Sequence, residues 1–280
     1  MLTGQVDLHT HSLASDGTQT PGENVRMAWE IGLAAVAITD HDTVDGLEEA
    51  MEEGKRLGFQ VVPGVEISTM AGGQDIHMLG YFVNYKDPVF LERLQELRSA
   101  RDRRNELMLE RLRQLGIMIT MEDVRNALEP GKDKGTIGRP HLANVLLKKG
   151  IVSSMEEAFR EYLGKGAKAY AATERITPET AIRWIHDAGG SAVIAHPGLY
   201  GDDTLVREIM ELGLEGIEVY HSDHTPEDEQ RYRQLAERTG LLATAGSDFH
   251  GTRAGKVFHA PMGTRTVSTA VLAYLNKRRE

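Results

Sequence analysis

The residues of this chain that are best able to do chemistry are its 11 histidines, which fall in short clusters with acidic neighbours. His9 and His11 stand two apart at the end of a predicted strand, residues 5–9, and Asp16 follows in the next loop. Side chains of a strand alternate between its two faces, so both imidazoles point to the same side and can bind one ion. The pair therefore predicts a metal site. A core histidine bonded to a backbone group is the alternative for any single case.

Other potential ligands repeat this pattern at or near the C-terminal ends of later predicted strands. They are His41 after residues 33–39, Glu66 after 59–65, His77 within 75–83, His196 after 191–195, and Asp248 with His250 after 241–245. In a parallel α/β barrel all such strand ends meet at one rim, where active sites are built. Six strand ends that carry such residues exceed coincidence, and we expect one shared site.

The number and type of these side chains predict a cluster of divalent ions. Zinc takes about four ligands and octahedral ions about six, so nine side chains suit two or three ions. The nine are His9, His11, Asp16, His41, Glu66, His77, His196, Asp248 and His250. Nitrogen and oxygen donors without sulfur favour Mn, Zn or Fe(II), and Mg less. Clustered ions of this kind activate a water and neutralise a phosphoryl group during in-line attack.

The composition is typical of a globular protein with one large domain, or one domain that carries an insertion. The chain has 280 residues, of which 40% are hydrophobic and 26% charged. It contains no cysteine, which excludes disulfides, thiolate nucleophiles and cysteine-ligated metals. The net charge of −10 argues against a protein that coats nucleic acid by bulk charge. No run approaches the ~18 apolar residues of a membrane helix, and residues 1–7 lack an export signal. We therefore expect a cytoplasmic protein with no membrane partner and no obligate protein partner.

The elements that must position the candidate ligands alternate between strands and helices. Besides the strands above, residues 215–220 read as a strand. Helices are expected from Thr20, over 43–57, from Thr177, over 204–212, over 225–238 and from about Ser268. Such alternation predicts an α/β protein with a mainly parallel sheet. About seven strands suit a closed or nearly closed barrel better than a sandwich.

Residues 88–175 interrupt this alternation and contain no strand signal. A long helix is expected over 90–115, with shorter ones from Thr120, over 140–149 and over 154–163. We interpret the segment as a helical subdomain inserted into a barrel made of residues 1–87 and 176–280. It carries 17 Lys and Arg against 13 Asp and Glu, a net of +4, which leaves −14 for the rest of the chain. A basic insert beside an acidic barrel suits a lid that contacts an anionic substrate. Gly131 and Gly135 would let this lid move. A solvated arginine-rich helix surface is the alternative.

Five segments together resemble the PHP family, named for polymerase and histidinol phosphatase. They are Asp7-Leu8-His9-Thr10-His11-Ser12, Thr39-Asp40-His41-Asp42, Gly64-Val65-Glu66, Ala195-His196-Pro197 and Gly246-Ser247-Asp248-Phe249-His250, in the family's order over about residues 5–255. The helical insertion resembles the stand-alone branch of 3′,5′-nucleoside bisphosphate phosphatases and related 5′→3′ exoribonucleases. The resemblance implies a distorted (β/α)7 barrel, the PHP fold, with an inserted helical subdomain and a trinuclear metal site.

The resemblance also implies how the ligands are shared among three ions. One ion would be held by His9, His11, Glu66 and Asp248, a second by Glu66, His77 and His196, and the third by Asp16, His41 and His250. The Glu66 carboxylate would bridge the first two ions. Asp40 is expected to orient a ligand imidazole or the strand end. Asp42 is expected only to help the following helix begin.

Two residues of the insert are candidates for substrate binding. The segment Gly138-Arg139-Pro140-His141 begins a predicted helix, where backbone N–H groups and a planar guanidinium both suit phosphate. In the branch named above this segment resembles one that contacts nucleotide. We expect Arg139 and His141 to contact a substrate phosphate, with an ordinary helix cap and a surface arginine as the alternative.

The remaining histidines and arginines are weaker candidates. His224 follows the sixth strand and is a candidate for substrate contact or proton transfer, while His221 is as well suited to the surface. His186 and His259 are expected to be structural. Four arginines are interleaved with glutamates at helical spacing and predict a solvated, ion-paired face: Arg98, Arg101, Arg104 and Arg111.

We therefore expect a metal-dependent phosphoesterase, with Mn as the favoured ion and Zn, Fe or Mg as alternatives. A hydroxide that bridges two ions beside Glu66 would attack phosphorus, and Arg139 would help to neutralise the phosphoryl oxygens. The branch resemblance implies a nucleoside 3′,5′-bisphosphate that loses its 3′-phosphate, with short 5′-phosphorylated RNA as a second substrate. The alternatives are a histidinol-phosphate phosphatase, a non-catalytic polymerase-associated module, and an amidohydrolase. The last usually has a bridging lysine, and no predicted strand end here carries one.

Overall fold

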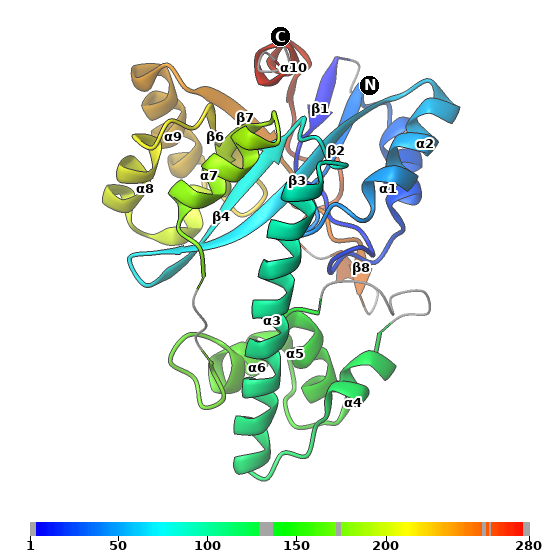
Figure 1. Ribbon diagram of the computed structural model, residues 1–280, viewed down its shortest axis with the longest axis vertical. Coiled ribbons are helices and arrows are strands. Elements are labelled where there is room, and N and C mark those ends of the chain that lie inside the picture. The colour runs from blue at the N-terminus through cyan, green and yellow to red at the C-terminus, as the bar shows by residue number, and fades with distance from the viewer. Residues whose placement is uncertain (1–3, 129–136, 172–174, 254–255, 258, 277–280) are drawn as a thin grey trace.

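The computed structural model of the chain describes residues 4–128, 137–171, 175–253, 256–257 and 259–276 (Figure 1). Gly131 and Gly135, which would let the insert move, lie outside these residues. The described part has two regions. A barrel-like sheet is flanked by helices, and a helical insert extends from one end of it along a single long helix (Figure 1).

The main sheet has eight strands in the order β10-β1-β2-β3-β4-β5-β6-β7. Their bounds are β1 Gln5–Asp7, β2 Ala35–Ile38, β3 Gln60–Ala71, β4 Gln74–Tyr81, β5 Ser191–Ile194, β6 Gly216–His221, β7 Leu242–Gly246 and β10 Val267–Ser268. A hydrogen bond from Leu8 N to Ala245 O, 3.0 Å long, joins the segments after β1 and in β7. The sheet is therefore nearly closed into a barrel. Two short strands, β8 (Thr252–Arg253) and β9 (Lys256–Val257), form a separate hairpin.

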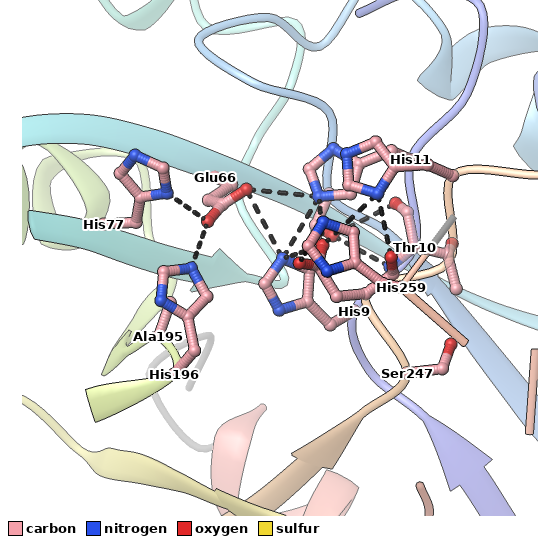
Figure 2. A network of polar contacts seen from close by, with 12 residues as sticks. His9, Thr10, His11, Glu66, His77, Ala195, His196, Ser247 and His259 are labelled. Carbon is pink, nitrogen blue, oxygen red and sulfur yellow. Dashed lines mark hydrogen bonds and ion pairs between the residues drawn. The ribbon is translucent and has the colours of Figure 1, made fainter. Parts of the chain in front are cut away.

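The sheet is not parallel throughout, and this corrects the prediction of parallel strand ends. β4 runs antiparallel to both β3 and β5, because Gly72 and Gly73, both at positive φ, turn the chain sharply between β3 and β4. Glu66 consequently lies within β3 and His77 within β4, rather than at the ends of parallel strands. Because the hairpin is long and β4 runs in the opposite direction, both side chains still reach the rim (Figure 2).

In the described part of the chain, six α-helices cover the barrel. They are α1 Pro21–Glu30, α2 Leu47–Leu57, α7 Pro178–Asp187, α8 Asp203–Met210, α9 Pro226–Thr239 and α10 Ala270–Leu275. Helix α1 begins as the sequence predicts, with a capping box between Thr20 and Glu23 and a proline in its first turn. Helix α2 begins at Leu47 rather than at residue 43, because the intervening residues form a turn. The apolar faces of these helices pack on the sheet and form the main core.

The insert is built on α3 (Pro88–Gln114), a helix of 27 residues. Its first half packs into the barrel core through Phe90 and Leu94, whereas its second half forms a separate core through Met108 and Leu112. That second core also takes in α4 (Met121–Asn126), α5 (Arg139–Lys148), α6 (Met155–Ala158) and a π-helical turn, Phe159–Leu163. None of the described helices combines the length and the apolar character that a membrane span requires. Helix α3 thus connects the insert to the barrel (Figure 1).

Candidate metal centre

The rim brings together the nine side chains that the sequence singles out. Four of their ligand atoms form the tightest group: His9 Nε2, His11 Nε2, Glu66 Oε2 and Asp248 Oδ1. The two imidazole nitrogens are 3.1 Å apart. His9 Nε2 is 3.3 Å from both carboxylate oxygens, and His11 Nε2 is 3.1 Å from both. All four residues are buried.

These separations provide a test of whether the group fits a metal ion. A tetrahedral ion with bonds of ~2.0–2.1 Å has ligand atoms ~3.3 Å apart, close to the spacing of this group. The buried Glu66 Oε2 and His41 Nδ1 are 2.9 Å apart, yet neither has a hydrogen-bond partner among the described residues. These two buried atoms lie close together without a hydrogen bond between them, an arrangement that suits a cation shared by both. The donor set therefore fits a divalent ion.

Glu66 lies at the centre of the cluster and faces in two directions (Figure 2). Its Oε2 faces His9 and His11, whereas its Oε1 is 2.7 Å from His77 Nδ1 and 3.1 Å from His196 Nε2. A carboxylate with its two oxygens in different donor groups can bridge two ions.

A further group of donors lies on the other side of His11. The Oδ1 atom of Asp16 is 3.1 Å from His250 Nε2, 3.9 Å from His41 Nε2 and 3.9 Å from His11 Nδ1. The rings of His11 and His250 stack with their centroids 4.1 Å apart. Close convergence of these donor atoms offers another place for an ion.

Opposite charges hold the donor cluster together. Burial alone would lower the pKa of His9, but the carboxylates of Glu218, Asp248 and Glu66 raise it well above its usual value. The pKa of His11 rises to about 10 in the same way, since Asp248 and Glu66 outweigh the effect of its burial. Burial would also raise the pKa of Glu66, but the surrounding imidazoles hold it well below its usual range. Protons on the His9 and His11 pair thus compensate the carboxylates, and a bound ion would displace them.

Two of the candidate ligands have strained backbones. His196 has φ of 27° and Asp248 has φ of 53°, in the region that favours glycine. Such conformations cost of order 1–3 kcal/mol each and persist only where the surroundings enforce them. The fold therefore maintains strain where these two side chains must be aimed at the cluster.

A second layer supports the ligands, and its central residue, Glu218, was missed by the sequence analysis. The Glu218 carboxylate lies 3.0 and 3.2 Å from His9 Nδ1 and accepts a hydrogen bond of 2.8 Å from His196 N. It is fully buried in β6. A charged residue between Ile217 and Val219, at a position where the strand faces the barrel interior, is the signal that could have identified it.

Asp40 and Asp42 also support the rim. Asp40 accepts hydrogen bonds from Ser12 N, Ser12 Oγ and Ser15 Oγ, so it orders the loop that carries Asp16 rather than a ligand imidazole. Asp42 does more than start a helix, contrary to the prediction. Its carboxylate accepts from Ser68 N at 2.7 Å and pairs with Arg101 of α3, which connects the insert to the rim.

The other histidines differ from expectation in several ways. His221 is fully buried, with Nε2 3.4 Å from Asp248 Oδ2, so the surface alternative is wrong. His224 has both ring nitrogens engaged, Nδ1 with Val219 O and Nε2 with Gly198 N, so neither is available for proton transfer. His259 is not merely structural, because it lies over the cluster, 3.5 Å from Asp248 Oδ2 and 2.7 Å from Asp223 Oδ2 (Figure 2). His186 pairs with Glu215 away from the rim, in the structural role expected of it.

The predicted solvated arginine face is wrong for two of its four members. Arg104 is only 4% exposed, and the Arg101 side chain only 11%. One face of α3 packs over the rim, which helical spacing alone does not reveal. A cavity of about 150 Å³ lies there, and its lining includes Arg101, Arg104, Arg139 and Arg175 together with Asp16, His41 and His77 of the donor cluster. A basic cavity therefore adjoins the cluster.

The two predicted phosphate contacts lie differently with respect to this cavity. Arg139 lines it and pairs with Asp75 at 2.6 Å. His141 is buried, and its Nδ1 accepts a hydrogen bond of 2.9 Å from Gly138 N, which caps the first turn of α5. Arg139 therefore remains a candidate, while His141 supports the helix on which Arg139 lies.

Comparison with known proteins gives a consistent result. The PHP domain family matches residues 7–129. The chain is 34% identical to a 3′,5′-nucleoside bisphosphate phosphatase of Chromobacterium violaceum, over 89% of this chain and 88% of the relative. It is 36% identical to the 5′-3′ exoribonuclease Rnm of Escherichia coli, over 87% of this chain and 84% of the relative. The chain is 35% identical to a phosphoribosyl 1,2-cyclic phosphate 1,2-diphosphodiesterase of Eggerthella lenta, over 90% of this chain and 96% of the relative.

A solved structure also resembles the whole chain. It is described as a putative metal-dependent phosphoesterase from Bifidobacterium adolescentis, has a TM-score of 0.86 and is 33% identical. The match covers 98% of this chain and 96% of that one. Both the barrel and the insert therefore have counterparts in a protein of this description.

Proposed function

The chain belongs to the PHP family, and on that premise we propose that it is a metal-dependent phosphoesterase that removes the 3′-phosphate of nucleoside 3′,5′-bisphosphates to give 5′-monophosphates. One observation carries the proposal. A cluster of nine buried or half-buried donors, arranged around the Glu66 carboxylate, opens into a cavity lined by four arginines. The donor cluster suits metal-assisted hydrolysis of one phosphate, and the arginine-lined cavity suits another anionic group on the same substrate.

The residues that would hold metal are the nine named from the sequence. We propose three ions, with manganese as the favoured one, because imidazole and carboxylate donors suit Mn, Zn and Fe(II). Bound ions of this kind supply an activated water and neutralise the charge on the phosphoryl oxygens.

The chain's own residues orient the reacting groups. Glu218 holds the His9 ring by its Nδ1, so that Nε2 faces the cluster. Asp40 orders the loop of Asp16, and the Asp42–Arg101 pair holds α3 over the rim. The insert thereby encloses one side of the site. Enclosure excludes water and strengthens the electrostatic attraction between a substrate phosphate and the arginines.

The same arrangement supports short 5′-phosphorylated RNA as a second substrate, trimmed from its 5′ end. Such an RNA end offers a terminal phosphate and a neighbouring phosphodiester, which match the spacing of groups in a 3′,5′-bisphosphate. The identity to the Escherichia coli exoribonuclease favours this candidate. A non-catalytic module would not need the complete donor set, and histidinol phosphate would leave the arginine cavity without a role.

The experiment is a comparison of substrates. Protein reconstituted with Mn²⁺ is assayed for phosphate release from adenosine 3′,5′-bisphosphate, AMP and histidinol phosphate, and for nucleotide release from 5′-phosphorylated RNA. We expect rapid release from the bisphosphate, little from AMP, and none after a chelator removes the metal. Preference for histidinol phosphate would refute the proposed substrate, and full activity without metal would refute the proposed chemistry.

Matched histidine variants test the site. His9→Ala removes a donor from the cluster and is expected to abolish turnover and reduce bound metal. His186→Ala removes a histidine that pairs with Glu215 outside the cluster, and this variant is expected to retain wild-type turnover and bound metal. If the His9 variant kept full metal content and rate, the assignment of the metal centre would be wrong.

A further inference from the structure

The two histidines that face Glu66 Oε1 come from neighbouring antiparallel strands. His77 lies in β4, and His196 follows Ala195 directly after β5. His77 Nδ1 and His196 Nε2 lie 2.7 and 3.1 Å from the same carboxylate oxygen, and the two rings are inclined at 73° to each other (Figure 2). An ion held between the two imidazoles requires a fixed separation of their nitrogen atoms, because the metal–nitrogen distance varies little. The separation of the two rings therefore depends on how β4 pairs with β5.

The pairing of β4 with β5 changes at the position of these histidines. Met78 lies opposite Ile194, so the next pair along the ladder is His77 with Ala195. A hydrogen-bonded pair in an antiparallel sheet exchanges two N–H···O bonds, one in each direction. One of the two is direct here, from Ala195 N to His77 O at 3.0 Å.

The hydroxyl of Tyr200 takes the place of the other ladder bond. It accepts a hydrogen bond of 3.0 Å from His77 N and donates one of 2.9 Å to Ala195 O. Two hydrogen bonds in series hold these backbone groups farther apart than one direct bond of ~2.9 Å would. The Tyr200 hydroxyl therefore spreads the two strands at the point where both histidines leave them.

The chain brings Tyr200 to this place through the short turn that follows His196. Residues Pro197–Tyr200 form a 3-10 turn, in which Leu199 N donates a hydrogen bond of 3.0 Å to His196 O. The Tyr200 side chain is buried, and its ring centroid lies 5.7 Å from that of His196. Tyr200 thus contacts the backbone on either side of the gap and one of the two imidazoles.

We propose that Tyr200 is a positioning residue, which fixes the separation of His77 and His196 and thereby sets the affinity of the ion between them. The inference rests on the proposed metal centre and adds to it a residue that ligates no ion. It also accounts for the positive φ of His196, a conformation that persists only where the surroundings enforce it. The His9 ring has a different support, the Glu218 carboxylate, so the ions at His9 and at His77 should respond separately to a change at Tyr200.

The substitution Tyr200→Phe keeps the ring in its buried place and removes only the hydroxyl. His77 N and Ala195 O then either approach each other to form a direct ladder bond or remain unpaired. A direct bond draws His196 toward His77, whereas unpaired groups no longer define the separation. Loss of an outer-shell partner typically costs 10–100-fold in metal affinity, so we expect one Mn²⁺ ion to bind at least about tenfold more weakly.

The test is a titration of the metal-free full chain with Mn²⁺, followed by competition with a chromophoric chelator and by counting the bound ions. Wild type is compared with Tyr200→Phe and with the matched control Tyr232→Phe. The buried Tyr232 hydroxyl bonds to the same turn, at 3.2 Å from Pro197 O, and to Asp203 Oδ1 at 2.8 Å. At the free Mn²⁺ concentration that just saturates wild type, Tyr200→Phe should hold one ion fewer, and Tyr232→Phe should match wild type.

A double variant identifies the ion that is affected. His77→Ala removes a ligand of the ion in question, so adding Tyr200→Phe to it should change Mn²⁺ binding by less than about twofold. A further tenfold loss in the His77→Ala background would contradict the proposal, because Tyr200 would then act on another ion.

The outcomes separate this inference from the proposed function. Wild-type Mn²⁺ affinity in Tyr200→Phe, beside rapid cleavage of bisphosphates by wild type, would overturn the role of Tyr200 and leave the function standing. Selective loss of one ion from a protein that cleaves no phosphate ester would overturn the function and leave the role of Tyr200 standing. A lower melting temperature of metal-free Tyr200→Phe, with Mn²⁺ binding unchanged, would also refute the proposal, because it would show a structural role alone.

Discussion

The substitution Glu218→Gln tests whether the residue beneath the proposed metal centre sets metal affinity. The Glu218 carboxylate binds His9 Nδ1 at 3.0 and 3.2 Å and accepts from His196 N at 2.8 Å, so it faces two nitrogen donors. Glutamine has nearly the same shape but presents one oxygen and one NH2 group. The amide oxygen can take the Oε2 position and still accept from His196 N, but the NH2 group then replaces Oε1, the carboxylate oxygen nearest to His9 Nδ1.

The expected magnitude follows from these contacts. Loss of an outer-shell partner of a metal-ligating histidine typically costs 10–100-fold in metal affinity, equivalent to about 1.4–2.7 kcal/mol. The buried His9 Nδ1, which then faces an NH2 group, adds a loss of folding stability of about 1–3 kcal/mol. We therefore expect a folded protein with a lower melting temperature and weaker Mn²⁺ binding.

Metal affinity is measured by competition with a chromophoric chelator, and stability by thermal unfolding of the metal-free protein. Glu215→Gln is the matched control, because Glu215 also faces a histidine and a backbone N–H, His186 Nε2 at 3.0 Å and Ala192 N at 2.7 Å, away from the centre. Both contacts go to the same oxygen, Oε2, which an amide oxygen can replace, so the control should keep wild-type metal affinity. If Glu218→Gln bound Mn²⁺ as tightly as wild type did, the supporting role of Glu218 would be refuted.

Three further predictions address the insert, the barrel and the protons of the cluster. Arg101→Met leaves the buried Asp42 carboxylate without its cation, so the free energy of unfolding measured in urea should fall by about 3–5 kcal/mol. Adding Asp42→Asn should recover part of this loss. If the losses of the two single variants simply added up in the double variant, the pairing would be contradicted. Gly246→Ala places a methyl group against the side chain and backbone of His9. It should lower the free energy of unfolding by about 1–3 kcal/mol and weaken metal binding. Unchanged Mn²⁺ affinity would show that metal binding does not depend on the exact position of His9. Because the pKa of His11 is raised to about 10 without metal, this ring is protonated at neutral pH; Mn²⁺ binding should therefore release protons and tighten as pH rises from 6 to 9. Calorimetric heats that do not depend on the buffer's heat of protonation would contradict this.

Most of the strands, and the side chains that converge at the rim, could be predicted from the sequence, because both leave local patterns. Alternation of apolar runs with helical stretches predicts the barrel, and histidines or carboxylates at strand ends predict a shared rim. The antiparallel β4 was not predicted, because the direction of a strand depends on the connection before it. Here that connection is the tight Gly72-Gly73 turn rather than a helix.

What remained unpredicted depends on contacts between distant segments. Glu218 reads as one polar residue in an apolar strand until β6 is placed beside His9. Arg104 belongs to a regular series of arginines, and only the packing of α3 on the rim separates its buried members from the exposed ones. His259 comes from a segment without regular structure, so no periodicity points to its position over Asp248.

The most direct test of the account compares two substrates with the same scissile group. Adenosine 3′,5′-bisphosphate and 3′-AMP each carry a 3′-phosphate, and they differ only in the 5′-phosphate that the arginine cavity is proposed to bind. The measurement is kcat/KM for phosphate release by the Mn²⁺-loaded enzyme. Hydrogen bonds to a charged group contribute about 1.5–3 kcal/mol, so kcat/KM for the bisphosphate should be at least about tenfold higher. Equal values for the two substrates would contradict the claim that one phosphate is anchored while its neighbour is cleaved.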